Sequence, residues 1–260
     1  MTNTERKAIV LAAGGGLGSA TAVRLARDGF EIVACDLNEA AVQRTSKAVR
    51  AAGGVCHPRV VDLADVERVR EDTQDIVDTL GTISVIVNIT GGPSPSEAVG
   101  IPLEVWRTQF DAMFLSIVQA TEIVLPGMRE QKWGRIITST SSGVVTPIPN
   151  LMVSNAIRST VLGWSKTLSM SIAADGVTAN VVVPGRIATA RIKQLDQVKA
   201  QRLGTTVDDV AAQSHQTIPA GRYGDPSEFA ELVNFLAGDA AGYITGSLMR
   251  VDGGLIPSVA

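Results

Sequence analysis

The sequence predicts an α/β fold, in which a doubly wound parallel sheet of about seven strands carries helices on both faces. Short apolar runs of strand length alternate with longer segments of helical period along almost the whole chain. These runs contain few polar residues, as strands buried on both faces require. Glycines also follow several helical stretches, where a residue without a Cβ ends a helix at little cost; they are Gly29, Gly53, Gly81 and Gly176.

The expected elements follow one another in a regular order. In the first half of the chain we expect strands at 7–13, 31–35, 55–61 and 84–88, with helices at 17–28, 39–52 and 65–80. In the second half we expect a long helical stretch at 103–131 that breaks near Asp111, a helix at 152–174, and strands at 135–139, 178–183 and 247–251. This alternation is typical of consecutive βαβ units.

Size and composition suit one domain that spans residues 1–260. The chain has 260 residues, of which 45% are hydrophobic and 19% charged, and no repeat, low-complexity tract or linker divides it. Residues 187–218 are rich in Gln, Arg, Thr and Asp. We expect this segment to be irregular and to form a lid over a substrate.

Charge and cysteine content narrow the class of partner. Lys and Arg number 23 against 26 Asp and Glu, a net charge of −3, and no basic cluster is large enough to hold a nucleic acid. The apolar run at 8–13 is too short to span a bilayer, so neither a membrane anchor nor a signal peptide is expected. Cys35 and Cys56 lack metal-ligand spacing, which predicts no metal site and buried thiols in a reducing cytoplasm, with a disulfide as the open alternative.

A glycine-rich turn, Gly14-Gly15-Gly16-Leu17-Gly18, joins the first expected strand to the first expected helix. Backbone N–H groups at such a helix amino end can bind the diphosphate of a dinucleotide. Asp36 closes the second strand 18 residues after Gly18, where a carboxylate can accept both adenosine ribose hydroxyls and repel a 2′-phosphate. The pattern predicts a Rossmann-type site for NAD(H) rather than NADP(H). The alternative is that Asp36 only caps the next helix.

Further motifs extend along nearly the whole chain. They are Asp62-Leu63, Asn88-Ile89-Thr90-Gly91, Gly134-Arg135-Ile136-Ile137 leading to Ser141, Pro184-Gly185-Arg186-Ile187-Ala188-Thr189, Gly221-Arg222-Tyr223-Gly224-Asp225-Pro226, and Tyr243-Ile244-Thr245-Gly246 ending in Val251-Asp252-Gly253-Gly254. In these motifs the chain resembles the short-chain dehydrogenase/reductase family, in the branch similar to 3-oxoacyl-carrier-protein reductases. The resemblance implies an oxidoreductase that uses NAD(H) on a carbonyl or alcohol substrate.

The resemblance also implies cofactor contacts beyond the glycine turn and Asp36. They fall on Asp62 and Leu63 for adenine, on Asn88 and Gly91 along the cofactor, and on Pro184, Gly185, Ile187 and Thr189 at the next strand end, where the last two would hold the nicotinamide carboxamide. For Thr189 the alternative is a local bond from its hydroxyl to the backbone. The family's first turn glycine is replaced by Ala12, and we expect Gly14 and Gly15 to restore the backbone freedom that Ala12 removes.

The catalytic positions depart from the family pattern. Hydride transfer to a carbonyl leaves an alkoxide, which needs a proton donor and hydrogen bonds aimed at that oxygen. The family uses Asn, Ser, Tyr and Lys, and these positions fall on Met113, Ser141, Ser154 and Arg158. Only Ser141 matches, and no tyrosine lies between Gly134 and Lys166. We therefore expect no phenol acid and an atypical Ser/Ser/Arg site.

Each remaining candidate has a limited chemical repertoire. Ser154 and Arg158 lie four residues apart, on one helix face. Ser154 could position a substrate or a water, but an alcohol is a far weaker acid than a phenol. Arg158 keeps the positive charge and can fork onto the nicotinamide ribose hydroxyls, yet it cannot give up a proton. Met113 is expected to fill the core and to interrupt the proton path.

Two functions therefore stay open. The first is an NAD(H)-dependent oxidoreductase whose proton comes from water, the substrate or the 187–218 segment. His215 is the candidate in that segment, the alternative being an exposed polar residue on a loop. The second is an NAD(H)-binding protein without hydride transfer, such as a sensor, an assembly subunit or a non-redox enzyme.

Two expectations concern partners. Arg186, Arg191 and Lys193 follow the Pro184-Gly185 turn, which suggests either a small-molecule substrate with an anionic group or a solvated basic face on a lid. The resemblance implies a homotetramer or homodimer in which the helices at 114–131 and 152–174 pair across an interface.

Overall fold

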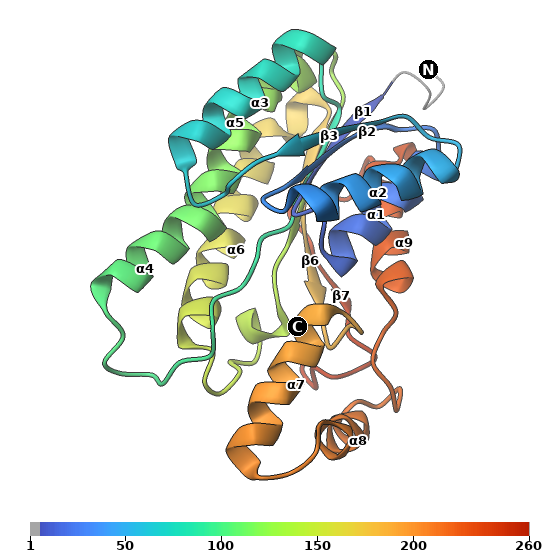
Figure 1. The fold of residues 1–260 in the computed structure, drawn as a ribbon. Coiled ribbons are helices and arrows are strands. Elements are labelled where there is room, and N and C mark those ends of the chain that lie inside the picture. The colour runs from blue at the N-terminus through green and yellow to red at the C-terminus, as the bar shows by residue number, and fades with distance from the viewer. Residues whose placement is uncertain (1–5, 260) are drawn as a thin grey trace.

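One parallel sheet organises the protein (Figure 1). The computed structural model describes residues 6–259, and in this range the strand order is β3-β2-β1-β4-β5-β6-β7. The expected doubly wound α/β fold is confirmed. The strands are β1 (Lys7–Leu11), β2 (Glu31–Asp36), β3 (Cys56–Val60), β4 (Val85–Asn88), β5 (Gly134–Ser139), β6 (Val177–Pro184) and β7 (Leu248–Val251).

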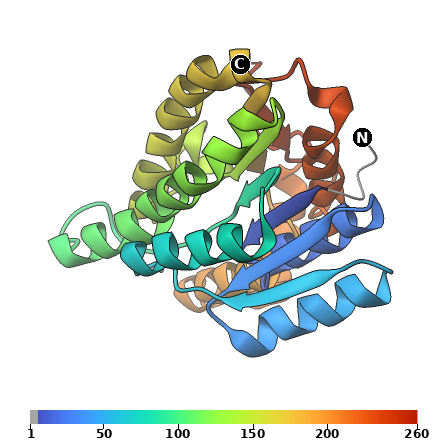
Figure 2. The same ribbon diagram turned by 90° about the horizontal axis from the view of Figure 1, so that it is seen from above.

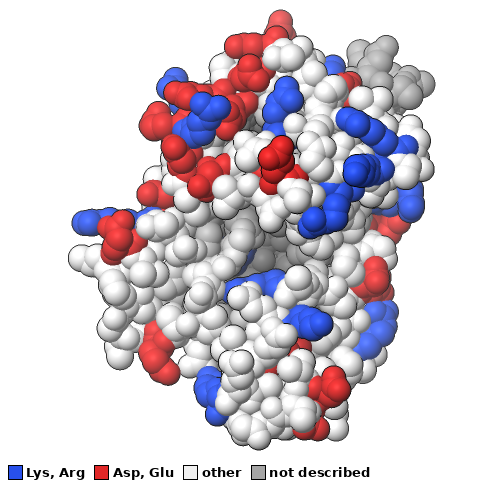
Figure 3. Space-filling view, in the orientation of Figure 1, with Lys and Arg blue, Asp and Glu red and all other residues white. Residues whose placement is uncertain are grey.

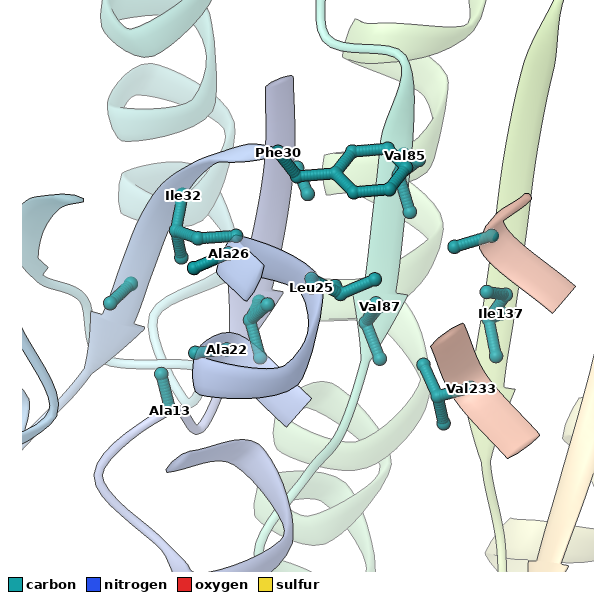
Figure 4. Close-up of a cluster of buried hydrophobic side chains, with 14 of the residues drawn as sticks. Ala13, Ala22, Leu25, Ala26, Phe30, Ile32, Val85, Val87, Ile137 and Val233 are labelled. Atoms are coloured by element: carbon teal, nitrogen blue, oxygen red, sulfur yellow. The ribbon is translucent and has the colours of Figure 1, made fainter. Parts of the chain in front are cut away.

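Helices cover both faces of the sheet (Figure 2). One face carries α1 (Gly16–Arg27), α2 (Glu39–Ala51) and α9 (Pro226–Ala237), and the other carries α3 (Val66–Leu80), α5 (Ser116–Glu130) and α6 (Met152–Ile172). Leu25 of α1 and Val233 of α9 pack beside Val87 of β4 in the first core (Figure 4). Each helix therefore buries an apolar stripe against strands that are apolar on both faces.

The path of the chain creates a switch point beside β1. β1 pairs in parallel with β2 on one side, from Lys7↔Glu31 onward, and with β4 on the other, from Ala8↔Val85 onward. The chain leaves β1 toward β2 and β3, and then crosses back to β4. Connections at the carboxyl ends of β1 and β4 consequently diverge, which is where open α/β sheets bind ligands.

The helical stretch expected at 103–131 changes type near Asp111 instead of breaking. It runs as α4 (Leu103–Phe110), a π-helical turn at Asp111–Leu115, and then α5. By length and composition alone, the 28 residues Leu103–Glu130 could cross a membrane, and 39% of their most apolar window is buried in the protein. Ile117, Val124 and Met128 of this stretch are buried in the second core.

The segment 187–218 is largely helical, so the expectation of an irregular segment was wrong. It contains α7 (Ala190–Leu203) and α8 (Val207–Thr217), capped by Thr189 and Thr206. Only Asp196 and Ala200 of α7 are buried, so the helix lacks the broad apolar stripe by which a helix is recognised in sequence. α9 was not expected either, although Asp225 and Glu228 form a capping box around a proline at its start.

Both cysteines are buried and free. Cys35 lies on β2 and Cys56 on the neighbouring β3. Burial raises the pKa of the Cys35 thiol to about 12. The expectation of buried thiols is confirmed, and the disulfide alternative does not occur in this structure.

Candidate functional site

A groove of about 320 Å³ opens at the carboxyl ends of β1, β2 and β4. This volume lies within the range of small-molecule sites, which is roughly 300–1,000 Å³. Figure 3 shows a hollow in this face with basic side chains along its lower edge. The groove is lined by Ala12, Cys35, Asp36, Leu37, Val61, Asp62, Leu63, Ala64, Gly91, Gly92, Gln109, Ala112 and Met113.

Three glycines of the turn, Gly14, Gly16 and Gly18, leave no room for a side chain. A Cβ at Gly18 would lie 2.3 Å from the Ala12 carbonyl oxygen, and a Cβ at Gly16 would lie 2.8 Å from Cγ2 of Thr189. The amino end of α1, whose N-cap is Gly15, has no side-chain cap. A bare helix end of this kind, with close backbone approach on both sides, fits a diphosphate group.

Ala12 carries the backbone strain of this turn itself. Its φ is 50°, in the left-handed region that non-glycine residues avoid. In the described chain neither Gly14 nor Gly15 has a positive φ, so the expectation that they restore the lost freedom was wrong. Gly14 serves another purpose, because a Cβ there would lie 2.8 Å from the Asp36 carboxylate.

Asp36 is held by backbone donors at the end of β2. One carboxylate oxygen, Oδ2, accepts from Gly14 N–H at 2.9 Å, and Oδ1 accepts from Asn38 N–H at 2.9 Å. The cap of α2 is Asn38, which accepts from Ala41 N–H, so the alternative that Asp36 only caps that helix was wrong. A carboxylate has about four acceptor sites, which leaves capacity for ribose hydroxyls. Across the groove, Asp62 accepts from Ala64 N–H at 2.9 Å.

Farther along the groove, the end of β4 combines a buried side chain with an open backbone. The Asn88 side chain is wholly buried and donates to the hydroxyls of Thr121 and Thr138, while its Oδ1 has no hydrogen-bond partner among residues 6–259. A Cβ at Gly91 would meet open space. Asn88 therefore ties β4 to the core, and the backbone near Gly91 faces the groove.

The turn after β6 is packed closely. Pro184 ends β6, and a Cβ at Gly185 would lie 2.7 Å from Cα of Asp252. Ile187 forms a parallel bridge with Gly224, in which Arg186 C=O and Ala188 N–H make the two hydrogen bonds. In such a bridge the N–H and C=O of Ile187 itself point to the other side.

The Thr189 hydroxyl makes a local hydrogen bond to the backbone, as the alternative interpretation of this residue predicts. Its hydroxyl accepts from Ile192 N–H at 3.4 Å and so caps α7. Its methyl group lies over Gly16, where it limits the space above the glycine turn.

Ser141 and Ser154 lie near the end of β5. Ser141 follows that strand, and its hydroxyl oxygen accepts from Gly143 N–H at 3.2 Å. Ser154 lies in the first turn of α6 and is 7% exposed. The Ser141 bond leaves its O–H free to donate to another oxygen.

Arg158 lies one turn farther along α6. Its Nη2 donates to the carbonyl oxygens of Thr90 (3.3 Å) and Gly91 (2.9 Å), and its Nη1 donates to Ser139 O (3.4 Å). Burial, together with the smaller effect of the nearby Arg191, lowers the pKa of Arg158 to about 10. The guanidinium is still charged at neutral pH. It thus places a cation at the carboxyl ends of β4 and β5.

Met113 fills the core beside these residues, as expected. It lies in the π-helical turn, is 3% exposed, and packs with Val153 and Ile157 on either side of Ser154. The same methionine lines the groove. An apolar side chain thus occupies the wall of the groove nearest α6.

His215 lies on α8, so the alternative that placed it on a loop was wrong. Its ring is half-buried and edge-on to Tyr223, with ring centroids 4.6 Å apart. The Tyr223 hydroxyl donates to Asp196 at 2.8 Å. In the described chain no contact between His215 and Ser141 or Ser154 is recorded.

The three basic residues after the Pro184-Gly185 turn do not act together. Arg186 forms an ion pair with the buried Asp196 and lies over the Tyr223 ring. Lys193 is exposed on α7. Arg191 turns toward the loop after β4, where its Nη2 donates to Pro93 O at 2.5 Å. The expected basic cluster is therefore divided, and only Arg191 reaches across to that loop.

Sequence reasoning missed residues that shape the groove. Gln109 of α4 and Ala112 of the π-helical turn line the groove. In the sequence, the only signal for them is that they lie close to Met113, which the family resemblance places at the site. Asn155 fixes the loop after Ser141, since its side chain makes two hydrogen bonds with the Ile148 backbone. No local pattern in the sequence signals that contact.

Comparisons with known proteins agree with this geometry over the whole chain. Residues 11–256 match the family described as enoyl-(acyl carrier protein) reductase. A 3-oxoacyl-[acyl-carrier-protein] reductase of Synechocystis sp. is 33% identical over 258 residues, which are 97% of this chain and 98% of that protein. An actinorhodin polyketide ketoreductase variant solved with NADPH is 27% identical, with a TM-score of 0.90 over 97% of this chain and 98% of that one. NAD⁺-bound xylitol dehydrogenase is 25% identical, with a TM-score of 0.89 over 98% of this chain and 100% of that one.

Proposed function

The chain belongs to the short-chain dehydrogenase/reductase family, and we propose that it is an NAD(H)-dependent oxidoreductase that interconverts a carbonyl and an alcohol. The observation that carries this proposal is the groove at the switch point, which leads from Asp36 to Gly91 and Met113. Arg158 binds the Gly91 carbonyl oxygen at that far end. The groove therefore extends from Asp36 to the loop that Arg158 holds, and we propose that the atypical Ser141, Ser154 and Arg158 site lies beside that end.

The choice of NAD(H) over NADP(H) rests on charge. Asp36 and Asp62 line the groove, and no Lys or Arg is among its described lining residues. A 2′-phosphate beside Asp36 would meet a carboxylate of like charge. The next residue, Leu37, is 62% exposed and offers no compensating cation. The solved relatives themselves include one with NADPH and one with NAD⁺.

The bound dinucleotide would supply or accept the hydride. The turn residues Gly14, Gly16, Leu17 and Gly18 would hold its diphosphate, while Asp62 and Leu63 would contact adenine. Ile187 would hold the carboxamide through its N–H and C=O, which the bridge with Gly224 leaves unused. The remaining contacts proposed on the family pattern are backbone near Asn88, Gly91, Pro184 and Gly185, and the Thr189 side chain.

The chain's own residues would stabilise the substrate oxygen. Reduction adds a hydride to the carbonyl carbon and a proton to its oxygen. Ser141 and Ser154 can donate hydrogen bonds to that oxygen, and the Arg158 charge favours the alkoxide. Arg158 keeps its own proton at neutral pH, so the transferred proton would come from water or the substrate.

One set of observations favours an alternative, a protein that binds NAD(H) without hydride transfer. Met113 makes the wall near Ser154 apolar, and neither tyrosine is recorded in contact with this site. Tyr223 is bound to Asp196, and Tyr243 is fully exposed. A sensor or an assembly subunit would need only the cofactor half of the groove.

Binding and turnover measurements separate these functions. NADH and NADPH are titrated against the protein by fluorescence, and NADH consumption is then followed with ketones, quinones and 3-oxoacyl thioesters. We expect NADH to bind at least about tenfold more tightly than NADPH, since one uncompensated like charge costs over ~1.4 kcal/mol. Turnover of at least one carbonyl class supports the oxidoreductase. Tight NADH binding with no turnover across the panel supports the alternative.

We further propose a homotetramer or homodimer that uses α5 and α6. Met170 on α6 is 69% exposed, as an interface residue would be in a single chain. Light scattering should give two or four times the chain mass of 27.2 kDa. A mass equal to one chain would contradict this assembly.

A further inference from the structure

Two arginine side chains converge on the loop that follows β4. Arg158 reaches it from α6, where its Nη2 donates to the Thr90 and Gly91 carbonyl oxygens. Arg191 reaches it from α7, where its Nη2 donates to Pro93 O at 2.5 Å and lies 3.3 Å from where a Gly92 Cβ would be. The two guanidinium groups therefore hold the same short segment, residues 90–93.

Neither guanidinium meets a carboxylate among the described residues. Arg158 makes contacts with three carbonyl oxygens, and Arg191 makes one such contact and one with the Gln194 amide. Burial lowers the pKa of both groups. An arginine has five N–H donors, so each side chain keeps donors for a further acceptor.

Arg186, by contrast, is a cation whose charge is neutralised by a carboxylate of the same chain. It follows the same β6 strand as Arg191, and it is paired with the buried Asp196. Two half-buried cations left without such a partner are costly unless an anion joins them. The pair is therefore best explained by an anion that arrives with a ligand.

The position of Arg158 distinguishes this anion from the cofactor diphosphate. The glycine turn follows β1, whereas Arg158 binds backbone after β4 and at the end of β5. β5 is two strands from β1, which is about 10 Å. The Arg158 end thus lies beyond the helix amino end that suits the diphosphate, and beside Ser141 and Ser154.

We propose that Arg158 and Arg191 together bind the carboxylate of the substrate, so that the reacting molecule is an oxo acid or a hydroxy acid. This inference rests on the proposed oxidoreductase and narrows its substrate class. Two planar guanidinium forks match the planar oxygens of a carboxylate. The reacting carbon would then lie next to the two serine hydroxyls.

The test compares a charged ligand with a neutral one of the same carbon skeleton, to which the ester adds one methyl group. Calorimetry measures 3-hydroxybutyrate and its neutral methyl ester binding to the protein–NADH complex, in which both reactants are reduced and no chemistry occurs. The variants are Arg191→Gln and, as a matched control, Lys193→Gln, which removes the same charge from the exposed side of the same helix. NADH affinity is measured in parallel for every variant.

We expect the acid to bind at least tenfold more tightly than the ester, since a charge-assisted hydrogen bond contributes about 1.5–3 kcal/mol. Arg191→Gln should abolish this difference, whereas Lys193→Gln should change it less than twofold, and NADH affinity should stay within twofold in both. Equal acid and ester affinities in the wild type would overturn the inference. So would equal effects of the two variants, a loss of NADH affinity alone in Arg191→Gln, or inorganic phosphate binding more tightly than the acid. Failure of the wild type to bind NADH would instead overturn the proposed function.

Discussion

The proposed active site has two ends of opposite charge, one inside the groove and one beside it. At the acidic end, defined by Asp36 and Asp62, backbone N–H groups hold carboxylates. At the basic end, defined by Arg158 and Arg191, backbone carbonyl oxygens hold guanidinium groups. The acidic end keeps the expected cofactor pattern apart from Ala12, while the basic end contains Arg158, at a position where the resemblance leads us to expect a lysine. Under the proposed function, the difference means that this chain would have diverged at its substrate end while it keeps a cofactor site at the other end.

The largest expected effect comes from a substitution in the glycine turn at the acidic end. Gly18→Ala would place a Cβ 2.3 Å from the Ala12 carbonyl oxygen and 2.7 Å from Ala13 Cα, so α1 must move away from β1. We expect a loss of about 3 kcal/mol in unfolding free energy, the upper range for overpacking, together with loss of NADH binding. Urea denaturation and NADH fluorescence measure the two effects.

The matched control is a glycine with open space around it. Gly163 lies within α6, and a Cβ there would meet nothing within 4 Å. Gly163→Ala should therefore raise the unfolding free energy by about 1 kcal/mol, the helix propensity difference. If both alanines changed stability alike, close packing at Gly18 would not be its reason.

The second effect tests the charge of the acidic end. Asp36→Asn keeps the size of the side chain but removes the charge that binds the ribose hydroxyls. NADH affinity should fall about 30-fold, equivalent to ~2 kcal/mol for a charged hydrogen bond, and NADPH should gain relative to NADH. Glu39→Gln, an exposed carboxylate outside the groove lining, should leave both affinities unchanged. An unaltered NADH to NADPH ratio in Asp36→Asn would contradict the role of this charge.

The same division governs what could be predicted from the sequence. The central strands β1, β4 and β6 were recognised because each is an apolar run that is largely buried on both faces. Asp36 was recognised because its place follows from chain order. α7 was not recognised, because a helix with few buried residues leaves little periodic pattern. Arg191 was noticed only as part of a basic cluster, since its contact with Pro93 joins residues 98 positions apart. Contacts of that kind exist only once the sheet has brought two loops together.

The third effect is the pH dependence of ligand affinity at the basic end. Burial lowers the pKa of Arg158 to about 10, so its charge is present below that pH and is lost as the pH rises through it. Affinity for 3-hydroxybutyrate should thus be flat from about pH 7 to 9 and fall roughly tenfold above pH 10, the effect of about one pKa unit of interaction. Calorimetry across this range measures it. The neutral methyl ester should show no such fall, and a parallel fall for both ligands would assign the change to something other than this charge.

The smallest effect concerns the strained residue at the acidic end. Ala12→Gly removes the strain of the left-handed conformation, which costs alanine about 1 kcal/mol. Glycine also raises the conformational entropy of the unfolded chain, and this offsets part of the gain in stability. We expect a net gain of about 0.5 kcal/mol in unfolding free energy. Ala20→Gly, within α1, should lose about 1 kcal/mol in the same urea titration. A comparable loss for Ala12→Gly would show that its methyl group contributes packing that outweighs the strain.

The central claim is that a hydride passes between a cofactor held at the acidic end and an oxo acid held at the basic end. Isotope transfer tests it most directly: NADH carrying deuterium at both C4 positions is incubated with acetoacetate and the wild-type protein, and the 3-hydroxybutyrate is analysed by mass spectrometry. We predict product that carries one deuterium on its hydroxyl-bearing carbon. Deuterium that stays on the cofactor, in a protein shown to bind both NADH and the acid, would contradict the claim.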